Sequence, residues 1–284
     1  MSGTWVVVAT LVLGFASGVL AGMFGIGGAV ITTPSIRALG ATPIHAVGST
    51  VPAILPGSIS GAYRYAKAGS VDWRVGLTCG TCGAVFAVAG AAATRLVDAH
   101  YLMIVTAGLL AVTGISQLRA ARATPAAVAV TVIAEPEDMP IGPEDLPGPI
   151  AGTVPPDAGS RRPLALLAAV GAGAGALAGV LGVGGGIVLM PAFTGLLKLP
   201  MRLAVGSSLV AVAIFSVPAL VTHTLLGNVD WRFALPLVVG VVPGAQVGAR
   251  LTLGASERLV RGLFGALLLV VSVVYALSEV LALR

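Results

Sequence analysis

Charged residues are scarce in this chain: Asp, Glu, Lys and Arg make up 10% of its 284 residues, whereas a soluble domain carries about 25%. Hydrophobic residues make up 57%. A soluble domain is therefore excluded, because a chain with so little charge would not stay in water. The composition predicts an all-α integral membrane protein.

Several chemical motifs are also absent. The sequence contains no Walker A pattern and no HExxH pair, and no acid lies in the middle of an apolar segment. These absences exclude nucleotide-driven transport and a zinc protease, and they leave no carboxylate site for a cation. We expect no enzyme activity, no cofactor and no metal. The 14 Arg and 2 Lys are scattered at segment ends, which argues against nucleic acid as a partner and fits contact with a lipid bilayer.

Eight long apolar segments account for most of the chain, each near the ~20 residues that cross a bilayer as a helix. Residues 119–162 interrupt the series: they are rich in Pro and Gly and hold six of the eleven acids, which is typical of a linker without a core. We predict a membrane unit at 1–118, a linker at 119–162 and a second membrane unit at 163–284. The segments are 5–36, 44–64, 75–95, 100–118, 163–197, 203–226, 232–252 and 259–282.

The two membrane units are predicted to be tandem homologous repeats of about four hydrophobic helices each. GVLAGMFGIGGAVITTP at 18–34 aligns with GALAGVLGVGGGIVLMP at 175–191, with 8 of 17 positions identical. Three matches in the same order indicate a duplication, although they leave open whether the repeats are parallel or inverted. The other two matches pair AVGST at 46–50 with AVGSS at 204–208, and GSVDWR at 69–74 with GNVDWR at 227–232.

The first segment of each repeat is too long for one plain crossing. Residues 1–36 as a single helix would span about 54 Å, against a hydrocarbon core of about 30 Å. We predict that the first helix of each repeat is broken at its glycine cluster, 25–28 or 182–186, because glycine lets the backbone leave helical geometry. A short helix is expected to restart just beyond each break.

The helix breaks are the predicted functional site. Irregular backbone in a bilayer is tolerated where it faces protein or a wet cavity, and the start of the following helix offers N–H groups and a positive dipole end to an anion. Close helix packing is the alternative use of such glycines, and hydroxyl side chains nearby either donate to an anion or bond the preceding turn. The predicted substrate-binding residues are Gly25, Gly27, Gly28, Thr32, Thr33, Ser49, Thr50, Gly182, Gly184, Gly185, Gly186, Ser207 and Ser208.

Three titratable residues are candidates for coupling transport to an ion gradient: His223, Asp72 and Asp230. Each also has a structural interpretation. The two aspartates precede a Trp at the expected start of a helix, where Asp caps free amides, and a lone His near a segment end is usually interfacial or hydrogen-bonded. Cys79 and Cys82 lie within an apolar segment, which favours small-residue packing over redox or metal chemistry.

The two glycine breaks followed by Pro34 and Pro191, the AVGS[ST] openings and the G-x-VDWR turns together resemble the TauE/SafE family of membrane proteins, over about 235 of the 284 residues. The resemblance implies a sulfite-exporter-like permease for small sulfur-containing anions, such as sulfite, sulfoacetate or other organosulfonates. It also implies a multi-pass protein of the bacterial cytoplasmic membrane, working as a secondary transporter.

Two other interpretations stay open at this point. One is a transporter of a different small anion, and the other is an accessory membrane subunit that binds a partner through the central linker. The sequence does not indicate the oligomeric state. It does not orient the chain either: with four crossings per repeat, nine Lys or Arg lie on the side of both termini and seven on the other.

Overall fold

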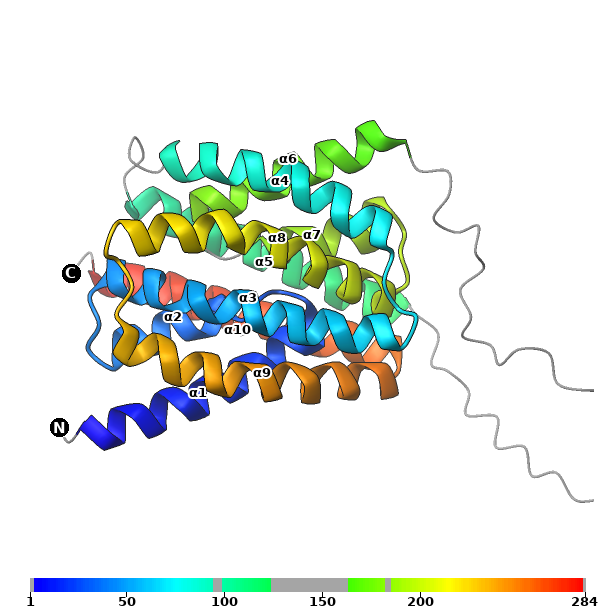
Figure 1. Ribbon diagram of the computed structural model, residues 1–284. Coiled ribbons are helices and arrows are strands. Elements are labelled where there is room, and N and C mark those ends of the chain that lie inside the picture. The colour runs from blue at the N-terminus through cyan, green and yellow to red at the C-terminus, as the bar shows by residue number, and fades with distance from the viewer. Residues whose placement is uncertain (1–2, 94–98, 124–162, 182–184, 283–284) are drawn as a thin grey trace, which may run out of the picture.

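The computed structural model describes residues 3–93, 99–123, 163–181 and 185–282, and these residues form helices and no strand. Figure 1 shows the long helices side by side as a bundle, with the start of α1 and the end of α10 at the same end. The helices are α1 (Gly3–Phe24), α2 (Ala29–Ala38), α3 (Pro43–Lys67), α4 (Trp73–Ala93), α5 (Ala99–Ala123), α6 (Leu164–Leu181), α7 (Gly186–Pro191), the short π-helix η3 (Ala192–Leu196), α8 (Met201–Leu225), α9 (Trp231–Gly254) and α10 (Glu257–Ala282).

Apolar side chains cover the outside of the bundle. Val85, Val112, Val239 and Val270 are 70%, 68%, 62% and 62% exposed. Three of the described helices, α1, α8 and α9, are by themselves long and apolar enough to cross a membrane. An exposed apolar surface of this kind fits lipid rather than water, so the prediction of an all-helical membrane protein is confirmed for the described residues.

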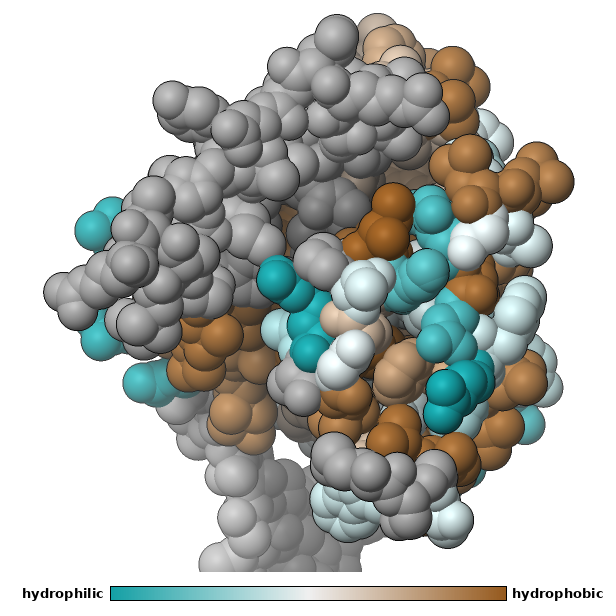
Figure 2. Space-filling model, turned by 90° about the vertical axis from the view of Figure 1, so that its left-hand side faces the viewer, coloured by the Kyte–Doolittle hydropathy of each residue, from teal (hydrophilic) through white to brown (hydrophobic). Residues whose placement is uncertain are grey.

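α3 and α8 run antiparallel, and their termini define the two ends of the bundle. At end A the last turn of α3 lies near the start of α8, and the Ser207 hydroxyl oxygen accepts the Asp72 backbone N–H at 2.8 Å. At end B the relation is reversed, and the Ser49 hydroxyl oxygen accepts the Asp230 backbone N–H at 2.9 Å. End A is on the right of Figure 1 and end B on the left. Figure 2 looks onto end B, where hydrophilic side chains gather among apolar ones.

Glycines bring α1 against α9 and α6 against α4. A Cβ at Gly14, Gly18 or Gly22 would lie 2.8, 2.4 or 2.1 Å from a carbonyl oxygen of α9. A Cβ at Gly171 or Gly175 would lie 2.5 or 2.0 Å from a carbonyl oxygen of α4. Only residues without a side chain permit backbones to approach so closely, as small residues do in membrane helices. The contacting residue numbers rise together along each pair, so each pair is parallel.

α5 packs against α10 and differs from the sequence prediction at its end. The Ser272 hydroxyl of α10 donates to the Ala107 carbonyl of α5 at 2.8 Å. The apolar segment was expected to end at residue 118, but α5 continues to Ala123 because its last turns, with Arg119 and Arg122, also suit a helix that leaves the hydrocarbon. The rest of the predicted linker, 124–162, lies outside the described residues.

Candidate functional site

A glycine cluster interrupts the first helix inside the bundle. α1 ends at Phe24 and α2 begins at Ala29. Between them, Gly25, Gly27 and Gly28 have φ angles of +70°, +78° and +77°. Residues with a side chain rarely adopt this left-handed conformation, whereas glycine does so at little cost. Figure 1 shows that α2 then turns back toward the end from which α1 came.

The second glycine cluster meets the first one. Gly185 precedes α7 with a φ of +68°, while Gly182 and Gly184 lie outside the described residues. A Cβ at Gly186 would lie only 2.4 Å from the carbonyl oxygen of Gly25. The backbones of the two clusters are therefore in direct contact, at a point where a side chain has no room.

Two side chains from other helices bond the carbonyl groups that the end of α1 leaves without helical partners. The Tyr65 hydroxyl of α3 donates to the Gly22 carbonyl at 3.0 Å, and the Thr252 hydroxyl of α9 donates to the Met23 carbonyl at 3.0 Å. A helix end inside a bilayer has no water to satisfy such groups. These hydroxyls supply the missing donors.

The loop between α1 and α2 is held in the same way. The Ser208 hydroxyl of α8 donates to the Gly25 carbonyl at 3.1 Å, and the Ser17 hydroxyl of α1 donates to the Gly28 carbonyl at 3.1 Å. Both serines are fully buried. Four hydroxyl groups from α1, α3, α8 and α9 thus fix the first break, so its shape is set by the whole bundle rather than by the loop alone.

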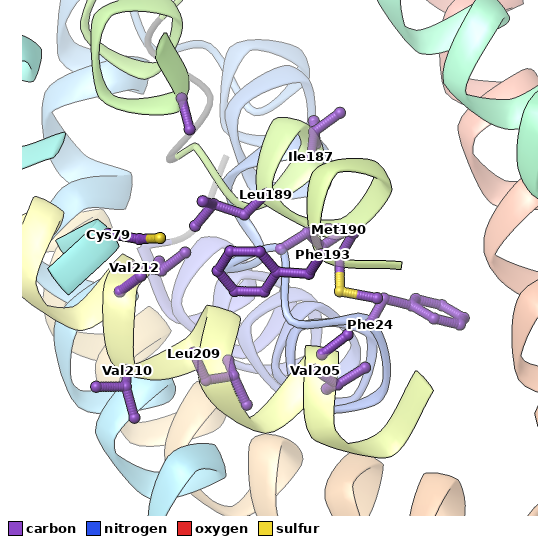
Figure 3. Close-up of a cluster of buried hydrophobic side chains, with 14 of the residues drawn as sticks. Phe24, Cys79, Ile187, Leu189, Met190, Phe193, Val205, Leu209, Val210 and Val212 are labelled. Atoms are coloured by element: carbon purple, nitrogen blue, oxygen red, sulfur yellow. The ribbon is translucent and has the colours of Figure 1, made fainter. Parts of the chain in front are cut away.

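Apolar side chains pack around the first break and around α7. A Cβ at Gly27 would lie 3.0 Å from Val212 and 3.3 Å from Ile54, so this glycine faces side chains rather than backbone. Val212 and Ile54 are themselves buried. Figure 3 shows the cluster, with Phe24, Met190 and Phe193 near Val205, Leu209 and Val212 of α8.

The hydroxyl residues predicted to bind substrate have different surroundings. Ser208 contacts the first break, as described above. The Thr32 hydroxyl donates to the Gly28 carbonyl at 3.2 Å and the Thr50 hydroxyl to the Val47 carbonyl at 2.8 Å, which are bonds to the preceding turn of their own chain. Thr33 is half-buried on α2.

Ser49 and Ser207, also predicted site residues, hold the two VDWR turns at opposite ends of the bundle. The aspartates of these turns begin helices. An Asp72 carboxylate oxygen accepts the Val75 N–H at 3.1 Å, and the Asp230 carboxylate accepts the Arg232 N–H at 2.9 Å. These contacts are those of helix caps.

His223, the remaining coupling candidate, lies in the last turn of α8 at end B. Its Nδ1 is 3.5 Å from the Asn228 amide nitrogen. The structure therefore places His223 beside the turn that connects α8 with α9.

Sequence reasoning missed Ser17, Tyr65 and Thr252 as residues of the site. Tyr65 and its partner carbonyl are 43 positions apart, and Thr252 and its partner are 229 apart. Gln117 was also missed: its amide donates to the Thr194 hydroxyl at 3.2 Å, and its carbonyl oxygen is buried with no bonding partner among the described residues. No local motif marks these residues, because their roles depend on which helices pack together.

Comparison with known proteins gives the class to which this arrangement belongs. A relative from Xylella fastidiosa (strain 9a5c) named "Probable membrane transporter protein" is 26% identical over 265 residues, covering 92% of this chain and 90% of the relative. "Probable membrane transporter protein YunE" from Bacillus subtilis (strain 168) is 26% identical over 251 residues, covering 84% of this chain and 86% of the relative. A Methanocaldococcus jannaschii relative, "Probable membrane transporter protein MJ0441", is 22% identical and covers 91% of each chain. No solved structure matches.

These relatives and the apolar bundle define a multi-pass membrane transporter rather than an enzyme. The family model described as "Sulfite exporter TauE/SafE" matches residues 10–275. The chain belongs to the TauE/SafE family, as the sequence motifs predicted.

Proposed function

We propose that the chain is a secondary transporter that exports small sulfur-containing anions, such as sulfite or organosulfonates, across the bacterial cytoplasmic membrane. The observation that carries the proposal is the direct contact of two helix breaks inside the bundle, Gly186 against Gly25. Transporters place their substrate site at such discontinuous helices between repeats. The family description, which names sulfite, supports the class of substrate.

The polarity of the first break favours an anion. Hydroxyl groups already donate to the carbonyl oxygens of Gly22, Met23, Gly25 and Gly28. The first N–H groups of α2 follow this break, at the positive end of the helix dipole. An oxyanion accepts hydrogen bonds from such groups.

The proposed transport cycle uses two inverted repeats. Contacts between the two membrane units occur in pairs. In each pair, the residue that belongs to the first unit in one contact is replaced by its equivalent in the second unit in the other contact, at sequence offsets of 157 or 158. The antiparallel course of α3 and α8 supports two units that enter the membrane from opposite sides. Inverted units of this kind can expose one central site to either side in turn. The recurring contacts are Gly14 with Leu237 and Gly171 with Cys79, and Ser49 with Asp230 and Ser207 with Asp72.

Ligand-induced stabilisation of the purified protein tests the substrate class. A ligand that binds only the folded protein raises its melting temperature by mass action. We expect sulfite and sulfoacetate to raise the melting temperature in a concentration-dependent way, while nitrate at the same ionic strength does not. Stabilisation by nitrate or phosphate alone would assign the site to a different small anion. No stabilisation by any anion would contradict an anion site.

A further inference from the structure

The cationic residues of the bundle are distributed very unevenly between its two ends. Twelve of the 16 Lys and Arg lie in the described residues. Ten of these twelve lie at end A, whereas end B has only Arg37, after α2 has turned back, and Arg232, at the start of α9. The end A residues are Arg64, Lys67 and Arg74 around the turn from α3 to α4, Arg119 and Arg122 at the end of α5, Lys198 and Arg202 at the start of α8, and Arg250, Arg258 and Arg261 around the turn from α9 to α10.

The assignment of these residues to one end rests on contacts between helix termini. Ser207 at the start of α8 bonds Asp72 before α4, and Arg202 donates to the Ala255 carbonyl after α9 at 3.0 Å. The end of α5 also lies beside the start of α10. Arg122 of α5 and Arg258 of α10 line the same cavity, which has a volume of about 490 Å³. The α3–α4 turn, the start of α8, the α9–α10 turn and the end of α5 therefore share one surface.

The imbalance arises because the first segment of each unit turns back. α2 ends beside the start of α3 at end B, and η3 ends beside the start of α8 at end A. If α1 with α2 were one full crossing, as in the count of nine against seven, several of these cations would change sides. For the twelve described residues, that count would be six against six, whereas the helix directions place ten at end A and two at end B.

We infer that end A faces the cytoplasm, so that the start of α1 and the end of α10 lie on the outer side. Lys and Arg close to the ends of membrane helices are retained on the cytoplasmic side, where the membrane potential and anionic lipid headgroups attract them. Among the described residues, two acids lie at end A, Asp72 and Glu257, and Glu257 pairs with Arg261, so ten cations against two acids leave an excess of positive charge there. The inference does not depend on the identity of the substrate.

The orientation assigns a side to each helix break. The α1–α2 hairpin enters from the outer side, and the α6–α7 hairpin enters from the cytoplasm. The connection between α5 and α6 starts at Ala123 and finishes at Leu164, both at end A, so it begins and ends on the cytoplasmic side.

Cysteine accessibility tests the orientation with a matched pair of positions. Ala68 follows α3 at end A and Leu226 follows α8 at end B; both are exposed, and they are equivalent at the repeat offset of 158. We would make Ala68→Cys and Leu226→Cys in the full chain and treat intact cells with a membrane-impermeant maleimide. The wild type is the background control, because its cysteines lie within α4 and are buried or half-buried.

We expect Leu226→Cys to be labelled in intact cells and Ala68→Cys only after permeabilisation. Thr4→Cys on α1 and Ala123→Cys on α5, both at exposed positions, repeat the comparison with independent sites and should follow the same division. Labelling of Ala68→Cys but not Leu226→Cys in intact cells would overturn the orientation. Equal labelling of both would overturn it too, because it would show that the chain inserts both ways.

Discussion

Substitution of Gly22 by Ala tests the close contact between α1 and α9. The added Cβ would lie 2.1 Å from the Ala245 carbonyl oxygen and 2.9 Å from its carbon. Neither atom can rotate away, because both belong to the backbone of a helix. Since non-bonded atoms need about 3.5 Å, the helices must separate by roughly 1 Å, which also loosens the contacts at Gly14 and Gly18. Overpacking of this kind costs about 1–3 kcal/mol or more.

The assay is the melting temperature of the purified protein in detergent. We expect Gly22→Ala to melt about 5 °C or more below the wild type. Gly173→Ala is the matched control, because its Cβ would meet nothing within 4 Å and Ala is the better helix former by about 1 kcal/mol; its melting temperature should be unchanged or higher. If Gly22→Ala melted like the wild type, the close approach of α1 and α9 would be refuted.

Three further predictions concern hydroxyl groups. Tyr65→Phe leaves the buried Gly22 carbonyl without its donor and should lower stability by about 1–3 kcal/mol, whereas Tyr63→Phe, at a 65% exposed position, should not; equal melting temperatures for the two would contradict the contact. Ser49→Ala and Ser207→Ala each remove the acceptor for one Asp backbone amide and should cost similar amounts, about 1 kcal/mol, in chemical denaturation; a marked difference between them would argue against equivalent repeats. Ser208→Ala removes the donor from the Gly25 carbonyl oxygen and exposes that oxygen to the proposed anion. The Kd for sulfite, measured by calorimetry, should therefore rise. An unchanged Kd would place the anion elsewhere.

The helices and their approximate limits could be predicted because membrane helices are marked locally. Long apolar runs bounded by charged or capping residues gave segments close to α3, α4, α8 and α9, and Asp230 begins α9 as an N-cap does. Length alone argued against one straight helix from residue 1 to 36. The positive φ angles at Gly25, Gly27 and Gly28 lie where that argument placed a break.

The parts that could not be predicted depend on which helices meet. A hydroxyl such as Ser207 has the same local sequence whether it bonds its own turn or the Asp72 amide, 135 positions away. The side of each turn also depends on whether α2 returns or continues, which the glycines permit but do not decide. For that reason, the number of Lys and Arg expected on each side of the membrane from the sequence differs from the number that the helix bundle places there.

The measurement that tests the central claim most directly is anion flux in proteoliposomes, with wild type and Gly27→Leu compared at equal protein incorporation. Gly27 has a φ of +78°, and a Cβ there would lie 3.0 Å from Val212 and 3.3 Å from Ile54, so a branched side chain there obstructs both the backbone turn and the approach to the α2 amides. The account predicts sulfite or organosulfonate flux by the wild type and its loss in Gly27→Leu, with the same expectation for Gly184→Leu in the second cluster. Normal flux in both variants would contradict a site at the helix breaks, and absence of flux of any sulfur-containing anion by the folded wild type would contradict the proposed substrate class.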